Sequence, residues 1–242
     1  IPYLYVMPSQ ESTTEVFVNA FFSSVSGFTT SGLTLIDEPE NLPQSFTFYR
    51  SFTQLVGGMS FIYLVITALY PESKIQSLRG FISGRSLHMK ELFGTITIIF
   101  TLYIIIVAFL FYIFGETDII NNFSLAISAF ATGGFLPEST ILDDLGWKEQ
   151  IIIMGAMIFG ALPFTFHYAF VRKKFLSPKL GKEALTYFII LGIAILLIIW
   201  LSGLDPLSGI FYAVTASTTS GLHPHEVTNF NGAMSTILIL LM

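Results

Sequence analysis

Charged residues are scarce in this 242-residue chain, and cysteine is absent. Only 11% of the residues are Asp, Glu, Lys or Arg, whereas ordinary soluble domains contain about 25%. A water-exposed surface of this size needs more charge than the chain supplies. Because there is no cysteine, disulfides and thiolate metal sites are excluded, and the redox compartment cannot be inferred from the sequence.

Long uncharged stretches accompany the scarcity of charge. Hydrophobic residues make up 53% of the chain, and the mean hydropathy is +0.73. Four stretches reach the length of about 20 residues that a helix needs to cross a hydrocarbon core. We therefore predict an all-α integral membrane protein with four complete spans and a fifth that is cut short. The stretches are Ser51–Tyr70, Leu92–Phe114, Gln150–Val171 and Ala184–Leu204.

The charges that remain predict the topology. Nine of the eleven basic residues lie in or beside Pro71–Lys90 and Arg172–Glu183, and thirteen of the sixteen acidic residues lie elsewhere, Asp37 and Glu38 among them. Because Lys and Arg mark cytoplasmic loops, both basic segments are predicted to face inward. Acidic outer loops either concentrate cations at a pore mouth or only keep the loops hydrated, and the sequence leaves both interpretations open.

A segment of 15 residues occurs three times. Residues 19–33 read NAFFSSVSGFTTSGL, residues 121–135 read NNFSLAISAFATGGF, and residues 208–222 read SGIFYAVTASTTSGL. In each copy a short apolar stretch leads into a Thr/Ser/Gly segment, and a polar loop and a further apolar segment follow. The repeat aligns one glycine and one threonine in all three copies: Gly32, Gly134 and Gly221, and Thr30, Thr132 and Thr219.

The apolar stretches in these copies are too short to cross a membrane. They are Glu15–Phe28, Asp118–Phe130 and Asp205–Ala216, and helices of this length cover only about 20 Å. Both flanks of each are predicted to lie outside, so each helix must enter the membrane and return. Non-helical backbone at membrane depth survives only when it is buried in protein or lines a watery cavity. We therefore predict helix–pore loop–helix units with re-entrant pore helices.

The residues that follow each short helix suit a selectivity filter. Rings of backbone carbonyls replace the water around an alkali cation, and glycine adopts the backbone conformations that such a strand requires. In a single copy, Thr-Gly would be more typical of close helix packing, but three copies in register favour a filter. No acidic residue lies in these segments, which favours a monovalent ion. The predicted ion-coordinating residues are Thr29, Thr30, Ser31, Gly32, Thr132, Gly133, Gly134, Thr218, Thr219, Ser220 and Gly221.

The chain resembles a known family of transporters. GFTTSGLT and the following NLPQSFTFYRSFTQLVGGMSFIYLVITALYP resemble the first filter and the next helix of the Trk/Ktr/HKT potassium transporter superfamily, closest to the prokaryotic Trk-type membrane subunit. AFATGGF resembles the second filter and TASTTSGL the third. The resemblance implies a potassium-channel-like pore of four repeats in a homodimer. It also implies a cytosolic nucleotide-binding regulatory subunit.

By this resemblance, the chain is expected to be a fragment that holds three repeats. The first, residues 1–71, lacks its preceding helix; the second covers residues 91–171; the third, residues 184–242, is truncated; and the fourth is absent. The second filter reads ATGG where the others read TTSG, so its ligand geometry is expected to differ.

The predicted function is potassium uptake across the cell membrane, with filters that open to the outside. Potassium is the substrate, no cofactor is expected, and the expected partners include membrane lipids but no nucleic acid. The alternatives are a channel-like subunit of an ATP-driven potassium pump and a sodium-permeable member of the same superfamily. An intramembrane protease would need a histidine at the depth of Ser31 or Ser220, and no span supplies one, so an enzyme is not predicted.

Five further residues stand out within the spans. Gly57 and Gly58 predict close packing of their helix against a neighbouring pore loop, since glycine in a helix costs about 1 kcal/mol relative to alanine. Arg50 is interpreted as snorkelling toward the interface, with a role at the pore mouth as the alternative. Pro163 is predicted to kink its span, and His167 is interpreted as an interface histidine.

The sequence HPHE follows the third filter segment. His223, His225 and Glu226 have spacing that can bind a metal, but no further ligands accompany them. A solvated loop at the outer mouth is the favoured interpretation.

Overall fold

The computed structural model contains helices and no strand in the residues that it describes, in agreement with the predicted all-α fold. The described residues are 2–6, 13–69, 89–115, 117–162, 166–167, 178–203, 205–224 and 232–242.

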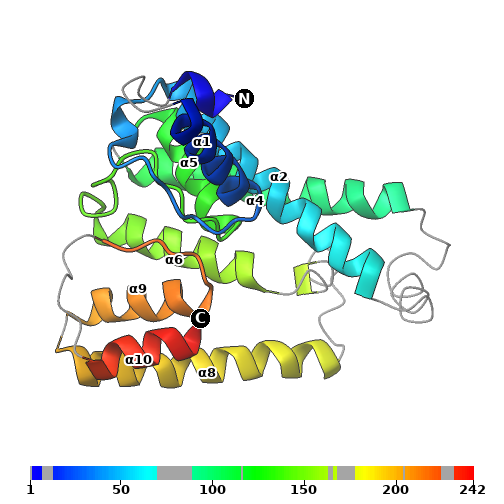
Figure 1. Cartoon of the computed structure of the whole chain (residues 1–242). Helices are drawn as coiled ribbons and strands as arrows, with labels where there is room; N and C mark the ends of the chain where they lie inside the picture. Colours follow the sequence, from blue (N-terminus) through cyan, green and yellow to red (C-terminus); the bar gives the residue numbers. More distant parts are fainter. Residues whose placement is uncertain are drawn as a thin grey trace.

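Eight α-helices longer than one turn are present in this part of the chain, with two 3₁₀ turns near the first of them (Figure 1). The 3₁₀ turns are η1 (Pro2–Tyr5) and η2 (Pro39–Asn41). The α-helices are α1 (Thr13–Phe28), α2 (Gln44–Leu69), α4 (Met89–Phe114), α5 (Ile119–Phe130), α6 (Trp147–Ala161), α8 (Pro178–Ser202), α9 (Pro206–Ser217) and α10 (Gly232–Leu241).

Three of these helices are the short ones that the repeat predicts. The helices α1, α5 and α9 begin and end within two residues of the predicted bounds. The start of α9 is fixed by two devices, since Pro206 has no amide proton to satisfy and the Asp205 carboxylate accepts a bond of 3.1 Å from the Leu207 amide. The predicted element type and length are therefore confirmed for all three.

The same packing contacts recur along the chain. Each short helix packs against the helix that follows it, as α1 does with α2, α5 with α6, and α9 with α10. The helix after one short helix also packs against the next short helix, so α2 contacts α5 and α6 contacts α9. Figure 1 shows the result as a progression from α1 and α5 through α6 to α9. The three repeat segments are therefore neighbours in chain order.

The short helices differ in how completely they are covered. A long helix precedes and packs against two of them, α4 against α5 and α8 against α9, and both short helices are largely buried. By contrast, α1 exposes Phe17, Phe21 and Phe22, at 60%, 63% and 40%. No long helix precedes α1 among the described residues, and this explains its open apolar face.

Two glycines allow the helices to approach closely. A Cβ on Gly57 of α2 would lie 2.0 Å from the carbonyl oxygen of Phe28, and one on Gly160 of α6 would lie 2.1 Å from that of Phe130. Phe28 and Phe130 are aligned by the repeat and end their short helices. The predicted close packing is confirmed at Gly57, whereas Gly58 has only ordinary contacts.

The predicted spans are only partly reproduced in the described residues. By length and composition, Phe93–Phe114 of α4 is the one helix there that could cross a membrane. The helix α2 is long enough, but it carries the polar residues Arg50 and Gln54, which hydrogen-bond to the segments that follow α1 and α5. The described part of α8 contributes a shorter apolar stretch, Leu185–Leu201.

The third predicted span, Gln150–Val171, is not a continuous helix. The helix α6 ends at Ala161, and Leu162 has an extended backbone with ψ of 145°. A residue that precedes proline is driven out of the helical region by the proline ring, which explains the break. Pro163 itself, and with it the predicted kink, lies outside the described residues.

The two basic segments fall mostly outside the described residues, which exclude 70–88 and 168–177. Where the structure resumes, the boundaries differ from those predicted. The helix α4 already begins at Met89, and α8 begins at Pro178, so residues 178–183 are helical rather than part of a loop.

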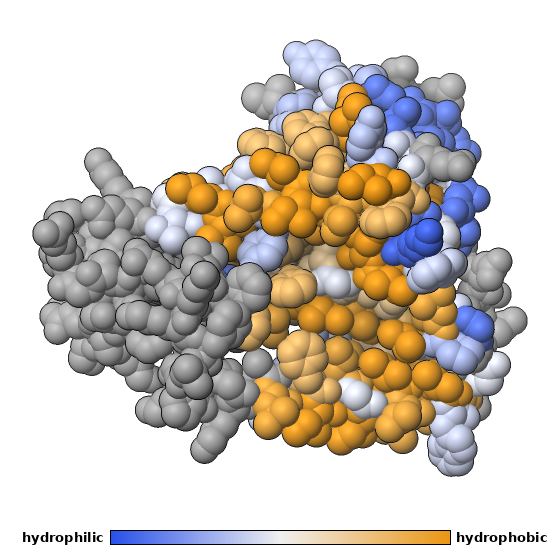
Figure 2. Space-filling view, turned by 180° about the vertical axis from the view of Figure 1, so that it is seen from behind, coloured by the Kyte–Doolittle hydropathy of each residue, from blue (hydrophilic) through white to orange (hydrophobic). Residues whose placement is uncertain are grey.

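The surface is dominated by apolar side chains. Figure 2 shows a broad hydrophobic face, with hydrophilic residues gathered mainly along the right-hand edge of this view. Large side chains such as Ile98, Leu196 and Trp200 are 69–80% exposed on the long helices α4 and α8. Exposure of apolar residues on this scale is unusual for a monomer in water and suits a helix surface surrounded by lipid.

Candidate functional site

The short helices end in the same backbone motif. At the end of α1, the amide of Ser31 donates to the carbonyl of Ser26 at 3.1 Å, and the amide of Thr30 donates to that of Gly27 at 3.2 Å. This pair of bonds is the Schellman motif, which satisfies the free carbonyls at a helix end. The corresponding bonds are Gly133 to Ser128 and Thr132 to Ala129 in the second copy, and Ser220 to Thr215 and Thr219 to Ala216 in the third.

The backbone after each helix alternates in the sign of φ. Thr30, Thr132 and Thr219 have φ of 53°, 49° and 53°, and they are the non-glycine residues with positive φ in the described part of the chain. Two positions later, φ is positive again, at 72° for Gly32, 80° for Gly134 and 70° for Gly221. The residue between them does not have positive φ in any copy. The aligned threonine and glycine columns of the sequence thus share one backbone geometry.

Hydroxyl groups tie two of the three loops to their short helices. The Ser31 hydroxyl bonds to the Ser26 hydroxyl at 3.0 Å, and Ser220 pairs with Thr215 at the same distance. In both loops the threonine at the helix end also donates its hydroxyl back to the last turn, Thr29 to Val25 and Thr218 to Val214, each at 2.8 Å. The first and third copies therefore use hydroxyls at the same positions.

The second loop lacks these hydroxyls and is held from another helix. It has Ala131 and Gly133 where the other copies have threonine and serine, and the hydroxyl of Ser128 is buried without a hydrogen-bond partner. Instead, the amide nitrogen of Gln54, a fully buried residue of α2, donates to the Gly133 carbonyl at 2.6 Å. The second loop thus has the same φ pattern as the others but a different support, and the expected difference in its ligand geometry stays a prediction.

The three loops lie side by side in chain order. A Cβ on Gly32 would lie 2.5 Å from the carbonyl oxygen of Gly133, and one on Gly134 would lie 2.7 Å from that of Ser220. Each glycine thus faces the middle carbonyl of the next loop. A Cβ on Gly221 would meet no atom of the described residues within 4 Å. The arrangement brings together the residues that the sequence predicted as a site, and its last glycine is open.

Arg50 lies beside this group of loops, on α2 one turn before Gln54. Its guanidinium donates to the Thr34 hydroxyl at 3.1 Å and lies over the ring of Phe135, 4.7 Å from the centroid. The side chain is only 2% exposed, and its Nε and Nη1 have no hydrogen-bond partner among the described residues. The interpretation that Arg50 snorkels to the interface is therefore wrong, because neighbouring loops enclose the side chain.

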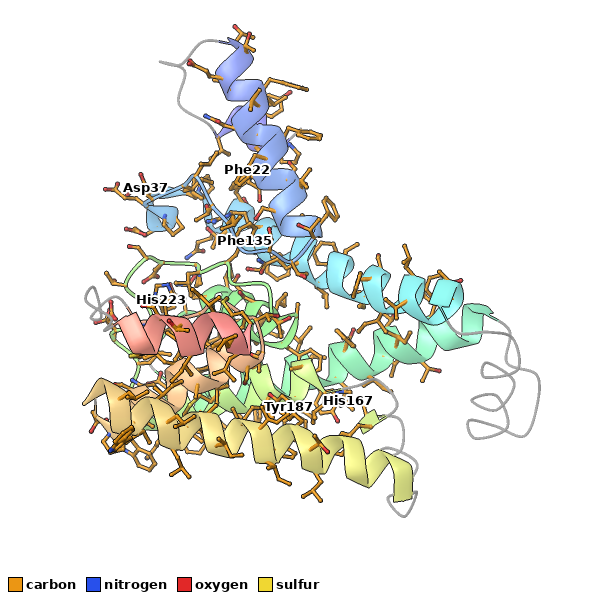
Figure 3. All side chains as sticks on the ribbon, turned by 60° about the horizontal axis from the view of Figure 1, so that its bottom comes forward. Phe22, Asp37, Phe135, His167, Tyr187 and His223 are labelled. Carbon is orange, nitrogen blue, oxygen red and sulfur yellow. The ribbon has the colours of Figure 1, made fainter. Side chains whose placement is uncertain are left out.

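A cavity of about 220 Å³ lies beside Arg50, between the loops that follow the first and second short helices. Its lining includes Thr34 and Asp37 from the first loop and Gly134 and Ser139 from the second. Asp37 and His223, which follow the first and third short helices, lie toward the edge of the molecule that carries these loops (Figure 3). The acidic outer loops of the sequence thus border the same side of the site.

A carboxylate joins the first two outer loops across this edge. Glu40 of η2 accepts bonds from the amide and the hydroxyl of Ser139, at 3.1 and 3.0 Å. Hydrogen bonds from the backbone amide of Glu40 itself, and then from Ser139, lower the pKa of this carboxyl group below its ordinary value. The contact is therefore made by the ionised form.

The histidines do not form a metal site in the described residues. No group of three potential metal ligands occurs there; His223 is described, whereas His225 and Glu226 lie outside that range. His167 is 2% exposed and lies among aromatic rings, with Nδ1 3.4 Å from the Tyr103 hydroxyl. Figure 3 shows it at the other end of the helices from Asp37 and His223. A buried position within the helices replaces the predicted interface position.

Sequence reasoning did not single out Gln54 or Met157. Gln54 carried a signal, because an amide in the middle of an otherwise apolar stretch needs a polar partner. Met157 carried none, since methionine is ordinary in an apolar helix; it contacts the third loop through a 2.8 Å approach of the Ser220 hydroxyl to its sulfur.

Comparison with known proteins is consistent with this architecture. A protein-family profile described as TrkH, cation transport protein, matches residues 4–203. An all-helical membrane transporter is thus the class that the fold and the match define, rather than an enzyme. The chain belongs to the TrkH family of cation transport proteins.

Individual relatives and one solved structure extend the comparison. The chain is 29% identical to an uncharacterized cation transporter of Methanocaldococcus jannaschii, over 93% of this chain and 48% of the relative. It is 25% identical to the Trk system potassium uptake protein TrkG of Escherichia coli, over 93% of this chain and 50% of that protein. The crystal structure of the potassium transporter TrkH from Vibrio parahaemolyticus matches with a TM-score of 0.75 at 24% identity, covering 92% of this chain and 48% of that one. The chain thus spans about half the length of these proteins.

Proposed function

We propose that this chain supplies three strands of a selectivity filter through which potassium enters the cell. The observation that carries the proposal is the alternation of φ in all three loops, positive at the threonine and again at the glycine two residues later. Alternation of left-handed and right-handed residues turns successive carbonyls to the same side of a strand, whereas a uniform β-strand points them to opposite sides. A row of carbonyls on one side is what a bare cation needs in place of water.

The surroundings of the loops support a cation as the occupant. No acidic side chain lies in residues 29–32, 132–134 or 218–221, so carbonyl dipoles and hydroxyls are the available ligands. The negative ends of the α1, α5 and α9 dipoles precede the loops directly. The proposed ion-coordinating groups are those predicted from the sequence, from Thr29–Gly32, Thr132–Gly134 and Thr218–Gly221.

The choice of potassium rests on the relatives, one of which is named as a potassium uptake protein. Sodium permeation is the alternative within the same architecture. A channel-like subunit of an ATP-driven pump is the alternative outside it. Flux in liposomes that contain the complete protein distinguishes them, because a pump subunit requires ATP and its ATPase, and a sodium-permeable member shows no preference for potassium.

The assembly around this chain is part of the proposal. A fourth strand is expected to lie next to Gly221, where a Cβ would meet no atom within 4 Å. The filters are proposed to open outward in the plasma or inner membrane, with the basic segments facing the cytoplasm. A homodimer, lipid contacts and a cytosolic nucleotide-binding regulatory subunit are proposed as partners. Co-purification with such a subunit supports this last point, and unchanged transport after its deletion opposes it.

Serine substitution of the aligned glycines tests the filter. In the complete protein, Gly32→Ser and Gly134→Ser force a side chain into the left-handed region, which costs about 1–2 kcal/mol, and push it against a neighbouring carbonyl. We expect the potassium-to-sodium permeability ratio to fall about tenfold or more, since 1.4 kcal/mol corresponds to a factor of about ten. The measurement is the permeability ratio in liposomes.

Gly203→Ser is the matched control. Gly203 also has positive φ, at 64°, but it lies between α8 and α9, where a Cβ would meet no atom within 4 Å. Its substitution introduces the same backbone strain outside the loops and is expected to keep the parental ratio. If Gly32→Ser, Gly134→Ser and Gly221→Ser all keep that ratio, the loops are not the filter.

A further inference from the structure

The middle residue of each loop is anchored by hydrogen bonds, but the groups that anchor it differ between the loops. In the first and third loops it is a serine whose hydroxyl bonds to the short helix of its own repeat, from Ser31 to Ser26 and from Ser220 to Thr215. In the second loop it is Gly133, which has no side chain to make this bond. The hydroxyl that would receive it, that of Ser128, is buried and has no partner.

The anchor of the second loop comes from Gln54. Its side chain is 0% exposed, and its Nε2 donates to the Gly133 carbonyl at 2.6 Å. A Cβ on Gly133 would lie 2.4–2.7 Å from the Cδ, Oε1 and Nε2 atoms of Gln54. The amide therefore occupies the space that a serine side chain would need, and this explains why Gly133 departs from the serine of the other copies.

In the third loop, a different side chain lies at the position that corresponds to Gln54. The helices α2 and α6 begin at Gln44 and Trp147, an offset of 103 residues, and the glycines that contact the short helices, Gly57 and Gly160, have the same offset. This offset aligns Gln54 with Met157. Met157 contacts Ser220, the residue that the repeat aligns with Gly133. The pair Gln54–Gly133 at the second loop thus corresponds to the pair Met157–Ser220 at the third loop.

We propose that Gln54 is a positioning residue that fixes the carbonyl of the second filter strand and thereby contributes to potassium selectivity. This inference rests on the filter proposed above. Two consecutive glycines, Gly133 and Gly134, make this strand the most free to change its backbone conformation. A carbonyl oxygen has two lone pairs, so the bond from Gln54 orients the peptide and leaves one lone pair for an ion.

The anchor also connects two repeats. Hydroxyl bonds within their own repeats hold the first and third loops, and the third loop also contacts Met157 of α6 through Ser220. The second loop is held through its backbone carbonyl, by the helix that follows the first loop. A displacement of α2 would therefore act directly on the Gly133 carbonyl. Among the described residues, the second strand is the one whose middle carbonyl accepts a side-chain hydrogen bond from a neighbouring repeat.

The test replaces the Gln54–Gly133 pair by the Met–Ser pair of the third loop, in the complete protein. Gln54→Met removes the donor and is expected to lower the potassium-to-sodium permeability ratio about threefold to tenfold, the range that corresponds to one net hydrogen bond. Adding Gly133→Ser to Gln54→Met recreates the Met157–Ser220 pair and gives the Ser128 hydroxyl a partner. The double variant is expected to regain the parental ratio to within about twofold. Gln54→Leu serves as a second removal of the donor if Gln54→Met does not fold.

Thr67→Val is the matched control on the same helix. The Thr67 hydroxyl bonds only to the Leu64 carbonyl of its own helix, at 3.1 Å, so the ratio is expected to stay parental. The inference is wrong if Gln54→Met and Gln54→Leu keep the parental ratio while Gly32→Ser lowers it, and the filter then stands. It is also wrong if the double variant is no better than Gln54→Met. If the glycine variants keep the ratio as well, the filter proposal fails instead.

Discussion

A threonine has positive φ in each of the three loops, although its β-branched side chain disfavours this region. Glycine is the usual residue at this position of a Schellman motif. Holding another residue there costs about 1–3 kcal/mol and requires that the surrounding structure fix the backbone. The strain is repeated at Thr30, Thr132 and Thr219, so the sequence tolerates an unfavourable backbone where the proposed ligands lie.

Replacing one of these threonines by glycine should separate stability from selectivity. Thr132→Gly relieves the strain, and we expect an increase of about 1 kcal/mol in the free energy of unfolding. The freed backbone should at the same time lower the potassium-to-sodium permeability ratio. Thermal unfolding of the complete protein in detergent and flux in liposomes measure the two effects.

Thr97→Gly provides the comparison within a regular helix. Thr97 lies in α4, where glycine costs about 1 kcal/mol, so this variant should unfold at a lower temperature. An equal loss of stability in Thr132→Gly would show that no strain is stored in the second loop.

At the scale of elements, contacts between helices and loops set the geometry of the site. Gly57 and Gly160 let α2 and α6 reach the backbone carbonyls at the ends of α1 and α5. These two contacts bring α2 close to the end of α1 and α6 close to the end of α5. The side chains three residues earlier, Gln54 and Met157, are thereby brought to the following loop.

Adding a methyl group at these contacts should separate the helices. Gly57→Ala and Gly160→Ala are each expected to destabilise the protein by about 1–3 kcal/mol, the usual cost of overpacking. Gly155→Ala, on the same helix as Gly160 but with no atom within 4 Å of its Cβ, should instead be neutral or stabilise by up to about 1 kcal/mol. Thermal unfolding distinguishes the two cases, and equal effects at all three positions would refute the close approach.

The contact between the outer loops should depend on pH. The pKa of Glu40 is lowered in the folded protein, so its contribution to stability is fully present above the ordinary glutamate pKa of about 4.3. This contribution is lost as the pH falls through the lower folded value. Glu40→Gln should therefore reduce stability at about pH 6, and the difference from the parent should shrink as the pH falls through the lowered folded pKa.

The partner of Glu40 provides a reciprocal check. Ser139→Ala removes one of the two bonds to the carboxylate and should weaken the effect of Glu40→Gln at neutral pH. The measurement is the unfolding temperature of the parent, the two single variants and the double variant across this pH range. If the difference in unfolding temperature between Glu40→Gln and the parent is the same at every pH, the ionised Glu40 carboxylate does not stabilise this contact.

At the scale of the whole molecule, the arrangement of charge predicts an orientation in the membrane. Hydrophilic residues of the described part gather mainly along one edge of the face shown in Figure 2. The basic segments are predicted to lie on the opposite side, because nine of the eleven Lys and Arg residues belong to them.

Cysteine labelling tests this orientation, and the absence of native cysteine makes it direct. Cysteines introduced at Thr140, in the exposed outer loop, and at Ser77, in the first basic segment, should react with an impermeant reagent from opposite sides. Thr140 is preferred to Ser139 because the latter bonds to Glu40. Labelling of both positions from outside intact cells would exclude the predicted topology.

Much of the architecture could be predicted because the information is local or repeated. The short helices follow from apolar stretches with capping residues such as Asp205, and the aligned Thr and Gly columns identified the loops before their backbone was known. The third span was predicted as one helix, but α6 ends at Ala161, because the residue before a proline favours an extended backbone, as Leu162 has. The burial of Arg50 was also missed, because snorkelling depends on what surrounds the end of the side chain.

The sequence by itself determined that the chain is helical, that it repeats, and which residues occupy equivalent positions, because composition, period and turn chemistry act over short distances. Only the tertiary structure decided which loop each side chain supports. Gln54 and Gly133 are 79 residues apart, and their contact exists because Gly57 seats α2 against the end of α1 while α2 also packs on α5. Since a hydrogen bond requires both partners within about 3 Å, a contact of this kind depends on the packing of whole helices and cannot be inferred from either segment alone.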